Sequence, residues 1–336
     1  MKEGEQLNLY NISAAPHIRD DVTTASIMGD VCLALMPSVF FGIVHFGVRA
    51  MFIIIISLAT CVLSEYVYEL LMKKKNTTND LSAVVTGLLL ALNLPPGVPC
   101  FIPFLGGIFA IIVVKQLFGG LGKNFMNPAL AARCFLLISF AGIMTDFKTG
   151  EMMWDGSFLK GADAVSGATP LACLKEGESL HIPSMFLGII PGCIGETCLP
   201  AIFCGAVFLK MRNVISFKIP VSYIVSFSVI VYAYGIFCGK GSGLSFVTAH
   251  LLGGGLMFGA FFMATDYVTS PVTDSGRFIF GVLLGILTAV FRLRGSQAEG
   301  VSYAILCGNM VVPLIEKITM PVPFGREKRK YGKTQN

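Results

Sequence analysis

Long blocks of apolar residues, separated by short polar stretches, recur along this chain. A helix that spans a bilayer needs about 20 mostly apolar residues. Several of the blocks are shorter than this, which is typical of discontinuous helices around a buried site. We predict about ten membrane-spanning helices, at roughly 27–46, 49–71, 80–93, 103–118, 128–142, 196–210, 219–238, 244–264, 277–292 and 301–316.

The order of these segments suggests two similar halves. Residues 80–142 show helix, Pro-rich break, helix, polar break and helix, and residues 244–316 show the same order. Each half holds five helices, and an odd number makes the halves face opposite ways across the membrane. The predicted fold is therefore all-α and integral to the membrane, with two inverted five-helix repeats. The predicted segments are 1–26, the first repeat 27–142, a loop 143–183, the second repeat 184–316 and a basic tail 317–336.

Composition makes lipid the solvent for most of this chain. Hydrophobic residues make up 54% of it and charged residues 13%, with a mean hydropathy of +0.74, whereas soluble domains carry about 25% charged residues. The side of the N-terminus receives sixteen of the 25 Lys and Arg residues and the opposite side seven. Cytoplasmic loops carry the excess of Lys and Arg. We therefore expect a protein of the cell (inner) membrane with both termini in the cytoplasm and the loop 143–183 on the extracytoplasmic side.

The charge and cysteine patterns argue against two other kinds of protein. The net charge of +5 comes from residues between apolar segments and in the tail, so nucleic-acid binding is not predicted. Most of the ten cysteines lie inside apolar runs, without a Cys-x-x-Cys pair. The four histidines show no ligand spacing. We interpret the cysteines as small packing residues and predict no metal centre.

The long outward loop carries the clearest chemical motif, DAVSGAT at residues 163–169. It matches D-x-x-[ST]-G-A-[ST], the acceptor pattern of ApbE-type flavin transferases, which move FMN from FAD onto the last hydroxyl. Pro170 favours an extended conformation of Thr169 that presents this hydroxyl, and the glycine and alanine before it lack bulk. We predict FMN on Thr169 through a phosphoester bond; an ordinary Ser/Gly turn is the alternative. The motif residues are Asp163, Ser166, Gly167, Ala168 and Thr169.

This motif and several other stretches resemble the RnfD and NqrB membrane subunits of ion-pumping electron-transfer complexes. NqrB members usually have a longer N-terminal extension, whereas this chain has APH shortly before its first helix, as RnfD does. The RnfD branch is therefore favoured. The similarity runs from about Ala15 to Ile315 and includes APH at 15–17, GGLGKNFMNPALAAR at 119–133, SGAT at 166–169, IPGCIGET at 190–197 and FMATDYVTSPVT at 262–273.

The resemblance implies a fold and a function. The family fold is similar to that of urea transporters, with two inverted five-helix repeats. Rnf complexes pass electrons between ferredoxin and NAD and export Na⁺ or H⁺. The implied partners are RnfA, RnfB, RnfC, RnfE, RnfG and an ApbE-type flavin transferase. The covalent FMN would exchange electrons with a flavin on RnfG, and homologues also hold a non-covalent riboflavin. No ferredoxin, NAD or iron–sulfur motif occurs in the sequence, so we expect one subunit of a translocase.

Two polar breaks on the expected cytoplasmic side, 124–128 and 265–273, come from opposite halves. Non-helical backbone at membrane depth must line a cavity or be buried in protein. Helix capping is the alternative, because Asn and Asp often begin helices. We predict a non-covalent flavin or an ion site at Asn124, Asn127, Asp266, Thr269 and Ser270.

Charged residues near helix ends are the remaining candidates. Arg292 and Arg294 near the outer face could hold the FMN phosphate, although interface anchoring is the favoured explanation. Glu65 and Glu69 are intramembrane acids and so functional candidates, or they reach water from a helix end. Glu196 follows a glycine and could line an ion path.

Two other functions stay open. An NqrB-like subunit of a Na⁺-pumping NADH:quinone reductase would share the fold and the covalent flavin. A substrate transporter or channel without a redox role would use a similar inverted-repeat bundle. The flavin on Thr169 separates this last class from the redox subunits.

Overall fold

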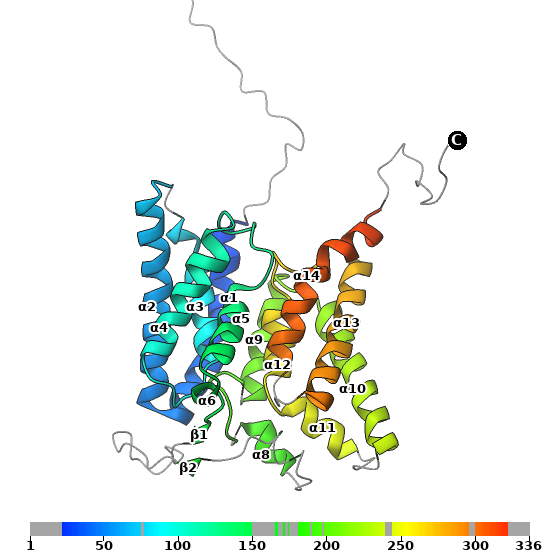
Figure 1. The fold of residues 1–336 in the computed structure, drawn as a ribbon. Helices are drawn as coiled ribbons and strands as arrows, with labels where there is room; N and C mark the ends of the chain where they lie inside the picture. The colour runs from blue at the N-terminus through cyan, green and yellow to red at the C-terminus, as the bar shows by residue number, and fades with distance from the viewer. Residues whose placement is uncertain are drawn as a thin grey trace, which may run out of the picture.

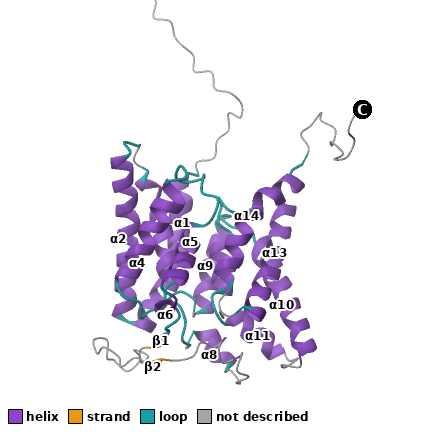
Figure 2. Ribbon diagram, viewed as in Figure 1, coloured by secondary structure: helices purple, strands orange, loops and turns teal. Residues whose placement is uncertain are grey.

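The chain folds into a bundle of helices that stand side by side, with a small two-stranded ladder beyond one end (Figures 1 and 2). The computed structural model describes residues 22–74, 77–149, 165–166, 171, 174, 181–188, 190–196, 198–238, 244–295 and 300–321.

Most residues of the first half lie in seven helical elements. They are α1 (Thr24–Phe46), α2 (Val48–Leu71), η1 (Thr78–Asp80), α3 (Ser82–Leu92), α4 (Phe101–Ile108), the π-helix η2 (Phe109–Gln116) and α5 (Pro128–Ser139). Local sequence sets their starts. The Thr23 hydroxyl accepts a hydrogen bond from Ser26 N at 3.2 Å and caps α1. Asn127 caps α5, whose first residue is a proline, the residue best suited to that position.

The second half follows a connection that contains α6 (Ala141–Met144), β1 (Lys148–Thr149), β2 (Val165–Ser166) and α8 (Ile182–Leu187). β1 and β2 are antiparallel, with Lys148 opposite Ser166. The second half itself contains α9 (Leu199–Met211), α10 (Lys218–Cys238), α11 (Leu244–Leu252), α12 (Leu256–Phe258), the π-helix η4 (Gly259–Met263), α13 (Asp274–Arg294) and α14 (Val301–Thr319).

Helix occupies each of the ranges predicted from the apolar blocks. Within the described residues, α1, α2, α10, α13 and α14 are long and apolar enough to cross a membrane. A sixth span is formed if α11 and the α12–η4 helix, which meet at a bend of 64°, are taken as one. The remaining apolar helices, α3, α4–η2, α5 and α9, are shorter. The prediction of a multi-pass helical membrane protein is therefore confirmed at the level of five to six spans.

The outer surface of the bundle is apolar. Phe40 of α1 is 71% exposed, Ile138 of α5 75% and Phe237 of α10 89%. Exposed side chains of this size on several helices would cost free energy in water. Their outward position shows that lipid is the solvent around these helices.

The two halves meet along two pairs of helices. α1 packs against α9, and α5 packs against α14. Inside each half the second helix packs against the fourth, α2 against α4 and α10 against α13. α1 and α9 approach so closely that a Cβ on Gly205 would collide with the Ala34 carbonyl oxygen. Glycine is therefore required at this contact.

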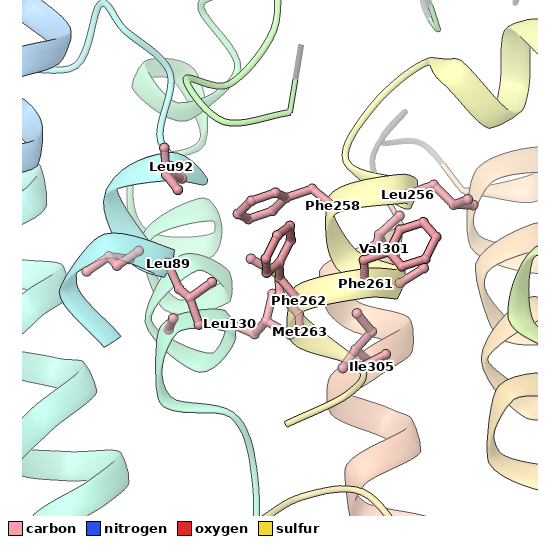
Figure 3. Packing of buried hydrophobic residues seen from close by; sticks show 14 of the residues in the cluster. Leu89, Leu92, Leu130, Leu256, Phe258, Phe261, Phe262, Met263, Val301 and Ile305 are labelled. Atoms are coloured by element: carbon pink, nitrogen blue, oxygen red, sulfur yellow. The ribbon is translucent and has the colours of Figure 1, made fainter. Parts of the chain in front are cut away.

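Apolar side chains from both halves fill the space between them (Figure 3). Phe258, Phe262 and Met263 of α12–η4 point toward Leu89 and Leu130 of the first half. Between helices in lipid, close packing of such side chains stabilises the contact. The broken helix of the second half is thus part of the central core.

The bundle has two distinct ends. α1 begins and α14 ends at one of them, which we name the terminal end (Figure 1). β1, β2 and α8 lie at the opposite end, which we name the loop end. The two predicted polar breaks, one before α5 and one before α13, both lie at the terminal end.

Candidate functional site

Two residues of the predicted flavin motif lie at the loop end. Val165 and Ser166 form β2 and pair with β1. Asp163, Gly167, Ala168 and Thr169, the other motif residues, lie outside the described residues. Two residues of the motif are therefore part of a short ladder beyond the ends of the helices.

The break before α5 contains the first two residues of the predicted inner site. Asn127 Oδ1 accepts hydrogen bonds from Ala129 N at 3.1 Å and Leu130 N at 3.5 Å, so the capping interpretation holds for this residue. Asn124 Nδ2 donates to Met126 O at 3.1 Å. Among the described residues, no donor reaches the buried Asn124 Oδ1. This oxygen could accept a hydrogen bond or bind a cation.

The break before α13 contains the other three. Thr269 Oγ1 donates to Asp266 Oδ2 at 3.1 Å, and Ser270 N donates to Asp266 O at 3.1 Å. Burial raises the pKa of Asp266 above its usual value of 3.8, and hydrogen bonds from Thr269 and from the backbone of Val268 and Tyr267 partly oppose this. The break is thus a compact turn around one acid.

Asn309 of α14 joins the two breaks. With its amide oxygen turned toward α5, it accepts from Asn127 N at 3.2 Å and its nitrogen donates to Thr269 O at 3.3 Å. The sequence analysis did not select this residue. An asparagine inside an otherwise apolar helix was the available signal, because polar side chains within the membrane are usually functional or paired.

A cavity of about 50 Å³ lies between the breaks, and we name it the break cavity. Asn124, Asn127, Asp266 and Val268 line it, together with Ser82 and Lys115. The structure therefore brings three of the five predicted residues together, while Thr269 and Ser270 stand behind Asp266. Space of this size holds water or a small cation, whereas ligand pockets measure about 300 Å³ or more. A flavin ring does not fit.

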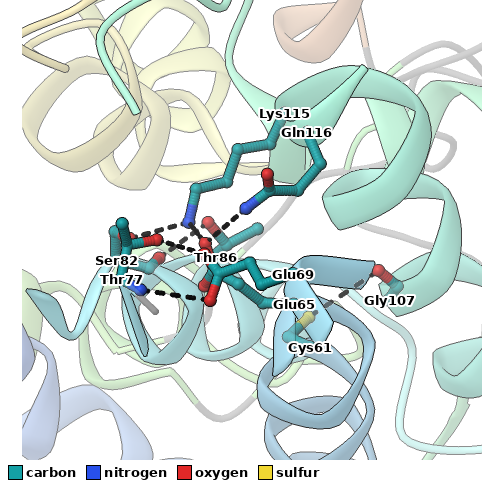
Figure 4. Close-up of polar contacts among 9 residues, drawn as sticks. All are labelled: Cys61, Glu65, Glu69, Thr77, Ser82, Thr86, Gly107, Lys115 and Gln116. Carbon is teal, nitrogen blue, oxygen red and sulfur yellow. Dashed lines mark hydrogen bonds and ion pairs between the residues drawn. The ribbon is translucent and has the colours of Figure 1, made fainter. Parts of the chain in front are cut away.

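A buried ion pair stands beside the break cavity (Figure 4). Lys115 Nζ, on the π-helix η2, lies 2.6 Å from Glu65 Oε1 and 2.7 Å from Ser82 Oγ. Gln116 Nε2 donates to the same Glu65 oxygen at 2.8 Å. The side chains of Glu65 and Lys115 are 0% and 2% exposed. Ser82 and Lys115 also line the cavity. Glu65 therefore compensates the positive charge of Lys115 at one wall.

Glu69 has a different role from Glu65. Its carboxylate accepts hydrogen bonds from Thr77 N at 3.1 Å and from the Thr77 hydroxyl. These contacts hold the turn between α2 and η1. Glu69 lies on the same side of α2 as Glu65 (Figure 4). Of the two predicted intramembrane acids, Glu65 contacts residues that line the cavity and Glu69 contacts a loop.

A second buried ion pair lies deeper in the bundle. Arg133 of α5 donates through Nη1 to Glu196 Oε1 at 2.8 Å and to Asn93 Oδ1 at 2.9 Å. Its Nη2 lies 3.3 Å from Cys193 Sγ. Gly195 N donates to Leu92 O at 2.8 Å, so the segment 190–196 folds back onto the end of α3. The predicted ion-path residue Glu196 is therefore inside the protein and paired.

The two arginines predicted to contact the FMN phosphate lie in different surroundings. Arg292 is buried: it donates to His250 O at 2.6 Å and to Gly254 O, and its guanidinium lies 5.4 Å from the centre of the Phe227 ring. It therefore caps the end of α11. Arg294 is exposed at the loop end. The phosphate contact stays a prediction, and Arg294 is the exposed one of the two arginines.

Comparison with known proteins gives the chain a family. The model described as the NQR2, RnfD, RnfE family matches residues 11–325. The chain belongs to this family. It is 42% identical over 330 residues to the D subunit of the Na⁺-translocating ferredoxin:NAD⁺ oxidoreductase complex of Acetobacterium woodii, and the match covers 97% of this chain and 98% of the relative.

Two further family members give the same picture. The D subunit of the proton-translocating ferredoxin:NAD⁺ oxidoreductase complex of Clostridium ljungdahlii is 40% identical over 332 residues, 96% of this chain and 98% of the relative. The D subunit of the ion-translocating oxidoreductase complex of Actinobacillus succinogenes is 32% identical over 346 residues, 93% and 97% of the two chains. The similarity is therefore full-length, and these relatives are D subunits, as the favoured RnfD branch predicted.

Proposed function

We propose that this chain is the D-type membrane subunit of an ion-translocating ferredoxin:NAD⁺ oxidoreductase, with electrons carried on FMN esterified to Thr169. The full-length similarity to D subunits of complexes that carry this name supports the proposal. The single observation that carries the flavin assignment is the DAVSGAT motif at 163–169, of which Val165 and Ser166 form β2 at the loop end. RnfA, RnfB, RnfC, RnfE and RnfG are the proposed partners, and an ApbE-type transferase would attach the flavin.

The proposed fold has ten membrane helices in two inverted repeats. The pairing of helices supports it, because α1 packs against α9 and α5 against α14, which hold the same positions in their halves. The α2–α4 and α10–α13 contacts also correspond. An axis that exchanges the halves would create this pattern. The short helices α3, α5 and α9 would then cross only part of the lipid, and α5 would begin at the polar break 124–128.

We propose the break cavity as a site for Na⁺ or H⁺. Its acceptors are the Asp266 carboxylate and Asn124 Oδ1, which no donor reaches among the described residues, and oxygen ligands suit hard cations and protons. Glu65 compensates the charge of Lys115 at the wall. The bound FMN would supply one- and two-electron chemistry at the loop end, and the residues of this chain would conduct the ion.

Covalent flavinylation tests the proposal directly. The chain is produced together with an ApbE-type transferase, separated in a denaturing gel and viewed under ultraviolet light. We expect a fluorescent band for the parent and for Thr169→Ser, which keeps an acceptor hydroxyl, and a dark band for Thr169→Ala. A dark parent would refute the redox function. Equal fluorescence in Thr169→Ala would refute the assignment of the residue.

A further inference from the structure

We propose that the Arg133–Glu196 ion pair controls how far the break cavity opens. The proposal rests on the cavity being the ion site of the function proposed above. The pair connects α5 with the α12–η4 helix. At the terminal end of the bundle, the break before α5 and the break after η4 form opposite walls of the cavity. The pair would therefore act as a positioning clamp between the two halves.

The first connection is the contact of Glu196 with the broken helix. Its carboxylate lies so close to Gly255 that a Cβ at that position would collide with Oε1. Gly255 precedes the first residue of α12, and α12 continues into η4. A carboxylate at the N-terminal end of a helix is stabilised by the helix dipole. Glu196 thus holds the start of this helix.

The other side of the same break is held by a cation. Arg292 donates to the carbonyl oxygens of His250 and Gly254, at the C-terminal end of α11, where the helix dipole is negative. An anion on one side and a cation on the other fix the bend between α11 and α12. Since Arg292 belongs to α13, it fixes the bend within the second half, whereas Glu196 connects the bend to the first half.

The second connection runs along α5. Arg133 lies six residues after Asn127, or about 9 Å along the helix. Asp266 lies three residues beyond the end of η4. Both helices therefore run from the ion pair toward the terminal end, one to Asn127 and the other to Asp266. A change in distance at the pair would move these two cavity walls relative to each other.

Glu196 of the pair also follows the loop-end elements β1, β2 and α8 in the sequence. The segment 190–196 carries Glu196 and follows the connection that contains the flavin motif. Glu196 Oε1 accepts from Arg133, and among the described residues no donor reaches its buried Oε2. A buried carboxylate with an open acceptor depends on its one charged partner, so a change in its charge would weaken the clamp.

A thiol in the cavity wall measures the opening. Val268→Cys is introduced into the full-length subunit within its purified complex, and the labelling rate with a polar maleimide is read by mass spectrometry of the peptide containing residue 268. We compare the labelling rate of Val268→Cys alone with that of Val268→Cys combined with Glu196→Gln, which removes the charge and keeps the shape of the side chain. We expect labelling about tenfold faster, equivalent to about 1.4 kcal/mol. Glu196→Asp, which keeps the charge, should stay nearer the parent rate.

Glu69→Gln is the matched control, because Glu69 is a buried acid that contacts only the Thr77 turn among the described residues. It should leave the labelling rate unchanged. Labelling of Glu196→Gln at the parent rate would overturn the clamp, as would equal acceleration by Glu69→Gln. Flavin fluorescence is recorded on every variant. A dark parent band would reject the proposed function, whereas the labelling rates would still report on the clamp.

Discussion

Removing one partner of the Glu65–Lys115 pair should destabilise the bundle strongly. Lys115→Met keeps the length of the side chain and removes its charge. The variant loses the 2.6 Å contact with Glu65 and the 2.7 Å contact with Ser82. Glu65, at 0% exposure, then has no charged partner among the described residues, and Gln116 Nε2 at 2.8 Å is the described donor that remains. Uncompensated buried charges of this kind cost about 3–5 kcal/mol.

The double variant decides whether this cost comes from charge. In Glu65→Gln combined with Lys115→Met both charges are gone, and replacing a whole buried pair is often close to neutral. We therefore expect the double variant to recover most of the stability lost in Lys115→Met. The coupling energy from the cycle should be about 3 kcal/mol, above the range of about 0.5 kcal/mol within which distant sites add.

The assay is unfolding in mixed micelles of mild detergent and SDS, followed by circular dichroism. Lys123→Met serves as a control, because Lys123 is exposed and surface changes usually stay within about 0.5 kcal/mol. The reasoning would be refuted if the two single variants simply added in the double variant. The loss would then reflect packing around η2, with no interaction between the two charges.

Two further predictions concern packing and pH. Gly205→Val should separate α1 from α9, because a Cβ there collides with Ala34 O, and it should cost about 1–3 kcal/mol; Gly142→Ala, where a Cβ meets nothing within 4 Å, should stay near the parent melting temperature. Asp266 is half-buried, and its desolvation raises its pKa. Its stability contribution is therefore complete below the unfolded value of 3.8 and is lost as the pH rises through its folded pKa. Melting temperatures between pH 4 and pH 8 should fall less steeply in Asp266→Asn, and an unchanged slope would contradict the raised pKa of this acid.

The hydrophobic pattern predicts where helices lie but not where they bend. The block 244–264 reads as one apolar segment, yet the chain turns by 64° between α11 and α12. Three consecutive glycines, at 253–255, were the signal for this break, because glycine runs punctuate helices. The π-helix η2 had no comparable signal. Its wide turns depend on tertiary contacts, such as the one that carries Lys115 to Glu65.

The polar site was predictable in part for a physical reason. Breaks such as the one at Asn127 are visible in the sequence, because capping residues and prolines mark them. Pairs such as Lys115 with Glu65 are not, because their members are 50 residues apart and no local rule connects them. The size of the break cavity was also out of reach. It depends on how Asn309 joins the two breaks, and this size argues against a flavin there.

The three described cationic side chains that are buried most deeply have one property in common. Lys115, Arg133 and Arg292 each lie where a helix is irregular or broken: on a π-helix, beside the end of α3 and at the α11–α12 bend. Burial of a charge is expensive even with a partner, and an apolar core would hold straight helices without it. Charges placed at irregular points instead fix which backbone groups meet across the break. The stability given up for these buried charges is therefore concentrated between the loop end and the break cavity, the two places that the proposed function would connect.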